Sequence, residues 1–386
     1  MLGLATALNS SSLKKKSVLT NKFSAEFDGT SDYIDVSILS SDLNKDSGTI
    51  SMWVRVQATS GNESFFNCSA GDSGDNKLVL MYNTSTAKIQ ANYKSGGTST
   101  VADHSISNDA IVALGWFHLA MTYNVDTPLI QLFLNGTRVA QRTTSFTRIS
   151  DDVGIDRVRL GSNSNADNTH HHGHIDEFIY ISGKDLTETE MLLLYNSGKP
   201  DDIGDLPSAI YSAIKCWLRF GDGQIAGDRD QTSVIFDEKN STLGSELVTD
   251  GDFPTGTTAW SIVSGSDADI SGGKANFVNA AKGQRIQQNF SFTSNKIYKI
   301  VIVVSNYSGS GALGFYMGGA YAKNNITADG TYTIYHFPED NTEAFFRAMT
   351  NSVTHTFSVD SITVKQIQGN PGFCVADATV RNNNVP

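Results

Sequence analysis

The sequence predicts an all-β protein built from two β-sandwich (jelly-roll) domains in tandem, preceded by an extended N-terminal arm. Glycine (34 residues), Phe (20) and Tyr (13) are frequent and proline (7) is scarce, a composition typical of short strands joined by polar turns. Apolar and polar residues also alternate over many short stretches, which favours half-buried strands over helices. At 386 residues the chain is long for one hydrophobic core, so two or three domains are expected.

Changes in this pattern divide the chain into five segments. Residues 1–22 show no apolar period and are predicted to form an arm rather than a domain. The first sandwich is expected over 23–199, a connecting segment over 200–243, the second sandwich over 244–366, and a polar, irregular tail over 367–386.

The first sandwich contains strands bounded by clear turn and helix signals. Asn135 and Gly136 lie between two apolar runs, which predicts a hairpin because both residues tolerate positive φ. Thr187 and Glu190 form a capping box, so one helix is expected to begin there and to stop by Gly198. Strands are predicted at 49–56, 77–82, 88–93, 116–123, 158–161 and 174–181, with the hairpin at 129–140.

The second sandwich and the connecting segment are also predicted from alternation. Two short strands are expected in the connecting segment, at 217–220 and 234–236. In the second sandwich, strands are predicted at 260–263, 285–292, 296–306, 313–317, 331–337, 344–349 and 354–365.

Charge and cysteine content exclude several classes of partner. The net charge of −11 argues against a nucleic-acid partner, because binding phosphates requires a basic face. Three distant cysteines form neither a disulfide framework nor a zinc pattern.

At the start, an apolar run precedes the positive charges, the reverse of a secretory signal. No apolar run reaches membrane-spanning length, so no membrane insertion is expected.

Two sets of motifs carry resemblances to known families. FDGTSDYIDV, GTISMWVRV, WFHLAMTYN, LFLNGTRVA and GHIDEFIYISGKDLTETEM make residues 23–199 resemble a laminin-G-like, concanavalin A-type jelly roll. LVTDGDFPTGTTAWSI and HTFSVDSITVKQ make residues 247–366 similar to carbohydrate-binding modules of the galactose-binding-like sandwich type. Together with the arm, the combination resembles structural proteins of marine tailed bacteriophage virions.

The virion resemblance implies a non-catalytic protein displayed on the particle exterior as a capsid decoration or a fibre. Its partners would be other virion proteins, reached through the arm, and host-surface polysaccharide bound weakly by many copies of an oligomer. A bacterial carbohydrate-binding adhesin is the alternative, against which the lack of a secretion signal counts. A jelly-roll glycoside hydrolase is the third hypothesis.

The hydrolase hypothesis depends on the strand that closes the jelly roll. Related hydrolases have an E-x-D-x-E strand, whereas this chain has His174-Ile175-Asp176-Glu177-Phe178. His174 and Phe178 replace the two glutamates, and strict alternation points Glu177 to the opposite face. No catalytic residue is therefore predicted.

The histidines of THHHGH, residues 169–174, are interpreted as solvated residues of a loop leading into this strand. The alternative is a transition-metal site, because His172 and His174 would share one strand face. Gly173 between them weakens that ligand geometry, and the role of the cluster is left open.

Calcium and glycan sites are suggested by residue type. No cofactor is required, but both resembling families carry structural Ca²⁺ held by oxygen ligands, and turn aspartates that cap backbone amides are an equally good interpretation. The calcium candidates are Asp28, Asp32 and Asp176 in the first sandwich and Asp252 and Asp360 in the second. Sugars stack on aromatic rings and hydrogen-bond to amides and guanidinium groups. The glycan candidates are Tyr307, Tyr316, Tyr321 and Arg347 in the second sandwich, and Tyr93 and Asn163 in the first.

Overall fold

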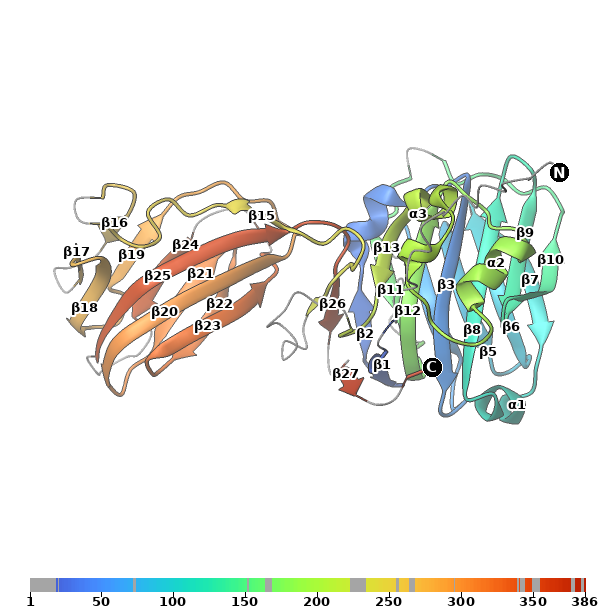
Figure 1. Cartoon of the computed structure of the whole chain (residues 1–386), viewed down its shortest axis with the longest axis horizontal. Coiled ribbons are helices and arrows are strands. Elements are labelled where there is room, and N and C mark those ends of the chain that lie inside the picture. The colour runs from blue at the N-terminus through green and yellow to red at the C-terminus, as the bar shows by residue number, and fades with distance from the viewer. Residues whose placement is uncertain are drawn as a thin grey trace, which may run out of the picture.

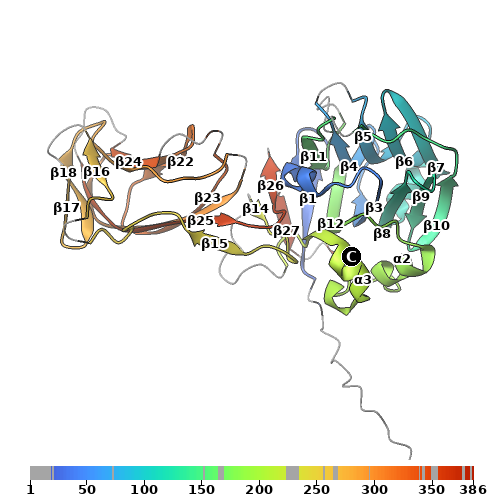
Figure 2. The same ribbon diagram turned by 90° about the horizontal axis from the view of Figure 1, so that it is seen from above.

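The structure is a computed structural model, and it shows two β-sandwiches side by side (Figures 1 and 2). It describes residues 19, 21–71, 74–150, 153–163, 169–222, 234–254, 257–263, 268–294, 296–338, 340, 344–348, 355–375, 379–382, 385 and 386; at 324, 345–348, 375 and 379–382 only the backbone is described. Among the helices of this described part, none combines the length and hydropathy that a membrane crossing requires.

The first sandwich packs two antiparallel sheets against each other. Sheet A runs in the order β10 (Thr137–Arg142), β9 (Leu129–Leu134), β8 (Trp116–Asn124), β3 (Ser47–Val56), β12 (His172–Ser182), β1 (Phe23–Asp28) and β27 (Thr379–Asn382), with β13 (Ile214–Leu218) also paired to β12. Sheet B runs β14 (Val234–Ile235), β26 (Gly372–Val375), β2 (Tyr33–Asp35), β11 (Arg157–Leu160), β4 (Glu63–Ser69), β5 (Lys77–Asn83), β6 (Lys88–Ser95) and β7 (Thr98–Ser105).

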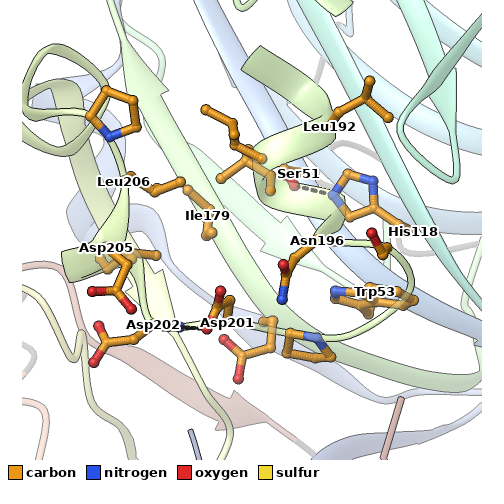
Figure 3. Close-up of a pocket in the computed structure, with 17 residues that line it drawn as sticks. Ser51, Trp53, His118, Ile179, Leu192, Asn196, Asp201, Asp202, Asp205 and Leu206 are labelled. Carbon is orange, nitrogen blue, oxygen red and sulfur yellow. Dashed lines mark hydrogen bonds between the residues drawn. The ribbon is translucent and has the colours of Figure 1, made fainter. Parts of the chain in front are cut away.

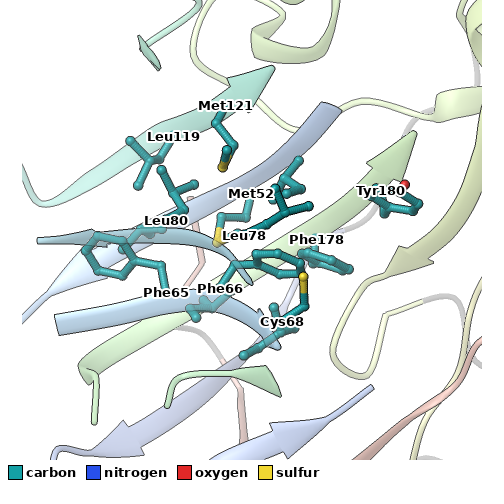
Figure 4. Close-up of a cluster of buried hydrophobic side chains, with 14 of the residues drawn as sticks. Met52, Phe65, Phe66, Cys68, Leu78, Leu80, Leu119, Met121, Phe178 and Tyr180 are labelled. Carbon is teal, nitrogen blue, oxygen red and sulfur yellow. The ribbon is translucent and has the colours of Figure 1, made fainter. Parts of the chain in front are cut away.

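The main core lies between these sheets, where alternate residues of each strand meet (Figure 4). Phe66 of β4 and Phe178 of β12 stack across the gap, with ring centroids 5.9 Å apart. Burying a phenylalanine side chain contributes about 2–3 kcal/mol, so this contact between the sheets is a substantial part of their adhesion. The predicted strands of this domain are confirmed, as is the hairpin, where Asn135 (φ 50°) and Gly136 (φ 75°) form the turn.

The outer face of sheet A is covered by helices (Figure 2). They are α2 (Glu188–Tyr195), which begins at the predicted capping box of Thr187 and Glu190, η2 (Ile203–Asp205) and α3 (Ser208–Ala213). They bury Met191, Ile203 and Ile210 in a second apolar cluster against the sheet. The remaining helices of the first sandwich in the described part are η1 (Ser37–Asp42) and α1 (Asn108–Ala113).

The second sandwich also consists of two antiparallel sheets around its own core. Sheet D runs β17 (Ala268–Ser271), β18 (Lys274–Ala280), β25 (His355–Ile367), β20 (Tyr298–Gly309) and β23 (Gly330–His336), with β15 (Leu243–Glu246) paired to β25. Sheet E runs β16 (Ser261–Val263), β19 (Arg285–Gln288), β24 (Ala344–Ala348), β21 (Leu313–Met317) and β22 (Ala320–Ile326). The strands predicted here are confirmed, except that the one predicted at 285–292 ends at Gln288 as β19; β15, β17, β18 and β22 were not predicted.

The prediction of a tandem arrangement with an irregular tail is wrong in one respect. The tail returns to the first sandwich, where β26 pairs with β2 and β14, and β27 pairs with β1. The connecting segment likewise contributes β13 and β14 to the first sandwich. The second sandwich is therefore inserted between β14 and β26, and the segments on either side of it add strands to both sheets of the first sandwich.

The two sandwiches meet at a small apolar cluster. Val234 and Phe236 of the connecting segment contact Ile297, Tyr335 and Ile367 of the second sandwich in a buried group. Ile38, Phe337 and Phe373 pack around it. Side chains from both domains thus share one core at the junction.

Candidate functional sites

The outer face of sheet E brings together several of the predicted glycan-binding residues. Leu313, Phe315 and Met317 of β21 point into the core, so Tyr316 between them points outward. Tyr321 of β22 is its cross-strand partner, and the two rings meet edge to face with centroids 5.2 Å apart. This pair is the centre of a surface that we call the tyrosine face.

Two arginine positions lie in the neighbouring row of the same face. Arg347 of β24 is opposite Gly314 of β21 on one side and opposite Arg285 of β19 on the other. Gly314 lies two residues before Tyr316 on β21, so the cross-strand row that contains Arg347 is about 7 Å from the row that contains Tyr316. The backbone therefore places Arg347 beside the tyrosines, as the glycan prediction requires, although its side chain lies outside the described atoms.

Gln287 completes the tyrosine face and was not among the predicted residues. It continues the row of Tyr316 through Phe345, its partner on β24. Its Oε1 is buried and has no hydrogen-bond partner among the described residues. The alternation of Arg285 and Gln287 in RIQQ is the sequence signal that could have identified it.

The other three glycan candidates lie elsewhere. The prediction of Tyr93 as a surface residue is wrong: it is 1% exposed, because β6 turns it inward with Ile89 and Ala91. Its hydroxyl donates to Lys45 O (2.8 Å), and burial raises the pKa of Tyr93 to about 12. Tyr307 is half-buried, and its hydroxyl donates to Gly311 O.

Asn163 lies where β11 leads into the loop that the sequence singled out as surface. Its backbone N–H donates to Thr169 O (3.0 Å), and its carbonyl accepts from the Arg159 guanidinium (3.2 Å). The rest of that loop, 164–168, lies outside the described residues.

The calcium candidates of the first sandwich do not converge. Asp28 accepts from Thr30 N (2.7 Å) and Ser31 N (3.2 Å), while Asp32 accepts from Asp28 N (3.0 Å). These are turn contacts, and they hold the pKa of Asp28 at about 2 although partial burial opposes this. In the pairing of β1 with β12, Asp28 lies opposite His172. His172 and Asp176 are four residues apart on β12, which places Asp28 and Asp176 about 13 Å apart along the strands. One ion cannot bind all three carboxylates.

In the second sandwich the two calcium candidates also have separate surroundings. Asp360 forms an ion pair with Lys274 (2.9 Å) and accepts from the Ser305 hydroxyl (2.6 Å). Asp252 is exposed in the turn that follows Thr249 and Asp250. Within the described part of the chain, no three acidic, histidine or cysteine side chains are arranged to hold a metal ion.

The histidines of THHHGH are less solvated than predicted. His171 is 0% exposed and its Nδ1 lies 2.8 Å from Glu63 Oε2. His174 is also buried, with Nδ1 3.3 Å from Ser24 Oγ and Nε2 3.1 Å from Gln57 Nε2. Their interpretation as solvated residues is therefore wrong: His174 lies within β12, His171 directly precedes that strand, and both rings are buried. His172 lies next to Gly29, and its half-buried ring is the most accessible of the three.

Strand β12 contains a bulge that corrects the predicted direction of Glu177. Glu177 has a φ of 49° and the register with β3 shifts between Asp176 and Ile179. Ile175 and Phe178 both reach the core between the sheets, so Asp176 and Glu177 both lie on the outer face. Strict alternation, which placed Glu177 on the opposite face from Asp176, is broken at this point.

These two carboxylates belong to a buried acidic group with a single arginine. Glu177 accepts from Trp217 Nε1 (2.6 Å) and Arg219 Nε (3.0 Å). Burial, reinforced by Glu177, raises the pKa of Asp176 well above its usual value, and burial likewise raises the pKa of Glu177 despite Arg219. Burial also raises the pKa of nearby Glu238 to about 7. Burial thus disfavours the ionised form of all three carboxyl groups.

A pocket of about 560 Å³ lies next to this group, between sheet A and helix α2 (Figure 3). Its polar lining includes four carboxylates, and the part of the lining that the structure describes contains no lysine or arginine. We call it the acidic pocket. It is lined by Ser51, Trp53, His118, Glu177, Ile179, Leu192, Leu193, Leu194, Asn196, Ser197, Pro200, Asp201, Asp202, Ile203, Asp205, Leu206 and Pro207.

His118 gives the pocket a neutral, unsatisfied imidazole. It is 1% exposed, and desolvation lowers the pKa of His118 to about 3. Its Nε2 lies 2.8 Å from Ser51 Oγ, while Nδ1 has no partner among the described residues. Trp53 packs edge-on against this ring, with centroids 5.5 Å apart. None of these pocket residues was predicted, because they become neighbours only through strand pairing.

The fold and these sites define a two-sandwich protein whose first domain is lectin-like. Residues 28–191 match the family model Laminin_G_3, described as the concanavalin A-like lectin/glucanases superfamily, and this stretch is a concanavalin A-like lectin domain. No curated protein sequence matches the chain.

Several solved structures are similar to this chain at low identity. The Ruminococcus gnavus IT-sialidase CBM40 bound to alpha2,3 sialyllactose is 17% identical, with 47% of this chain and 99% of that chain covered and a TM-score of 0.36. The SAP-like pentraxin of Limulus polyphemus is 12% identical (48% and 88% covered, TM-score 0.36). A putative carbohydrate binding protein from Bacteroides ovatus is 16% identical (57% and 56% covered, TM-score 0.37). Such TM-scores carry no argument about ligand or partner.

Proposed function

We propose that this protein is a non-catalytic carbohydrate-binding protein and that the tyrosine face of the second sandwich is its glycan site. The observation that carries the proposal is the edge-to-face pair of Tyr316 and Tyr321 on the outer face of sheet E, with Gln287 and Arg285 placed on the same face by the strand register. The concanavalin A-like lectin domain in the same chain is consistent with it.

The chemistry of this face matches what a sugar presents. A pyranose has an apolar C–H surface, which packs on an aromatic ring, and hydroxyl groups around its edge. Tyr316 and Tyr321 supply the rings, and Arg285 supplies guanidinium donors for the hydroxyl groups. Such an open face binds one glycan weakly, and many copies are needed for tight attachment.

Replacing Tyr316 with alanine is expected to weaken glycan binding by roughly tenfold, because about 1.4 kcal/mol of ring contact is lost. Full-length protein would first be applied to a glycan array at high valency, and the best glycan titrated by calorimetry against wild type, Tyr316→Ala and Tyr321→Ala. Tyr211→Ala is the matched control, since Tyr211 is 38% exposed on α3 of the first sandwich. An array without any hit, or equal affinity of Tyr316→Ala and wild type, would refute the proposal.

We also propose that the protein is displayed on the outside of a bacteriophage particle, as a capsid decoration or fibre. What supports this is the resemblance of the arm and the paired sandwiches to virion structural proteins, together with the apolar junction that the two sandwiches share. The competing proposal, a bacterial surface adhesin, uses the same glycan site.

Localisation distinguishes these two settings. Cryo-electron microscopy of purified particles is expected to show both sandwiches projecting from the capsid or tail, in an oligomer set by the particle's symmetry. Antibody labelling of the host cell envelope, together with particles that lack the protein, would instead support the adhesin.

A further inference from the structure

The acidic pocket shares its walls with the site where the chain first enters the fold. Leu19, the first described residue, packs against the apolar cluster on the outer face of sheet A. Ile179, Leu194 and Ile203 belong to that cluster and also line the acidic pocket. The path of the chain therefore reaches the neighbourhood of the pocket at Leu19.

The residues after Leu19 are fixed to the same face by hydrogen bonds. Asn21 Nδ2 donates to Asp176 Oδ2 (3.0 Å). The backbone N–H groups of Lys22 and Phe23 both donate to Asp222 Oδ2, at 2.6 and 2.9 Å. Strand β1 then begins at Phe23, so the start of the described chain has a fixed position and direction on sheet A.

The residues just before Leu19 have the opposite charge to the pocket. Lys14, Lys15 and Lys16 precede Leu19 by three to five residues, a reach of about 10–17 Å for an extended chain. The pocket offers Asp201, Asp202 and Asp205 and, among its described residues, no cation. Its rim also exposes Leu192 (48%) and Leu193 (43%), which match the apolar Leu13 next to the lysines.

We propose that the acidic pocket is the docking site for the N-terminal arm of the same chain. Lys14–Lys16 bind the aspartates of the pocket and Leu13 covers the exposed leucines of α2. Each exposed ion pair contributes at most about 1 kcal/mol and is screened by salt. The docked arm is thus held by several weak contacts, and a partner that takes the arm must displace it from the pocket.

Limited trypsin digestion of the full-length protein tests this, because trypsin cuts after Lys14–Lys16 and mass spectrometry reports the loss of the arm. Asp201→Asn/Asp202→Asn/Asp205→Asn is expected to be cleaved there roughly tenfold faster than wild type at low salt, a difference that shrinks at high salt. Asparagine keeps the oxygen with which Asp202 accepts from Gly204 N (2.8 Å), so η2 is retained.

The control variant is Asp126→Asn/Asp252→Asn/Asp269→Asn, which removes three exposed carboxylates outside the pocket. It is expected to be cleaved at the wild-type rate. Equal cleavage of the pocket variant and this control would overturn the proposal.

A disulfide between Lys16→Cys and Asp205→Cys distinguishes the chain's own arm from that of a second copy. The proposal expects the double variant to form a cross-linked monomer under mild oxidation, and each single variant to remain uncross-linked. Cross-linked dimers as the main product would overturn docking of the chain's own arm.

Discussion

Replacing Asp237 with alanine is expected to lower the free energy of unfolding by about 3–5 kcal/mol, the usual cost of breaking a buried charged network. Asp237 is completely buried where the chain crosses from the first sandwich to the second. Its Oδ1 accepts from Trp217 N (3.1 Å) and Lys239 N (3.2 Å). Its Oδ2 accepts from Asn240 Nδ2 (3.0 Å) and Asn370 N (3.1 Å). Alanine would remove this acceptor from the N–H groups of Trp217, Lys239 and Asn370, whereas Asn240 Nδ2 keeps its bond to Lys215 O (2.9 Å).

The position of these donors explains why the effect should extend beyond local stability. Trp217 lies on β13, before the second sandwich, and Asn370 follows β25, where the chain returns. Asn370 also donates to Asp42 Oδ2 (2.9 Å) and Lys215 O (2.8 Å). One carboxylate therefore fixes both crossings between the sandwiches.

Denaturant unfolding followed by tryptophan fluorescence measures the change. The exposed Asp103, which pairs with Lys88 (2.9 Å), provides the control, and Asp103→Ala should cost less than about 1 kcal/mol. If Asp237→Ala were as mild as Asp103→Ala, the network would not hold the junction.

Features encoded by a few neighbouring residues were predictable from the sequence. The hairpin turn at Asn135 and Gly136 needs only residues that adopt positive φ, and both do. The capping box of Thr187 and Glu190 forms as predicted, with Thr187 Oγ1 accepting from Glu190 N (3.3 Å). Tyr316 also followed from local alternation, because the core-facing residues of β21 define its opposite face. Its partner Tyr321 was expected in a loop and lies instead in β22, a strand that was not predicted.

Features that depend on distant partners were not predictable. Nothing in the two four-residue strands β26 and β27 indicates that they pair with β2 and β1, more than three hundred residues earlier. The acidic pocket has the same origin, since β3, β8, β12 and the η2 region supply its walls. Such pairing depends on the edges that distant strands present, and a local stretch of sequence does not contain that information.

The bulge in β12 did leave a signal in the sequence. In HIDEFIYI the inward residues Ile175, Phe178 and Tyr180 are spaced by three and then by two, whereas a regular strand keeps a spacing of two. An interval of three within an apolar alternation indicates one extra residue. That interval predicts the shared face of Asp176 and Glu177 that strict alternation missed.

Replacing Glu63 with alanine is the second large effect that we expect, a loss of about 3–5 kcal/mol in the free energy of unfolding. Glu63 Oε2 accepts from His172 N (2.6 Å) and lies 2.8 Å from His171 Nδ1, with both side chains buried. The His171 ring is enclosed by Phe27 and Phe65, at centroid distances of 5.7 and 5.2 Å. Without the carboxylate, this imidazole has no partner at Nδ1 and no access to water.

A double-mutant cycle separates this pair from the effect of simple truncation. His171→Phe keeps a ring between Phe27 and Phe65 but removes the group that Glu63 binds, so on its own it should also be costly. In the double variant Glu63→Ala/His171→Phe, the loss in the free energy of unfolding should be smaller than the sum of the two single losses by about 1–3 kcal/mol. Additive losses would mean that the two side chains stabilise the fold independently. His171 would then stabilise the fold through the space that its ring fills rather than through its hydrogen bond to Glu63.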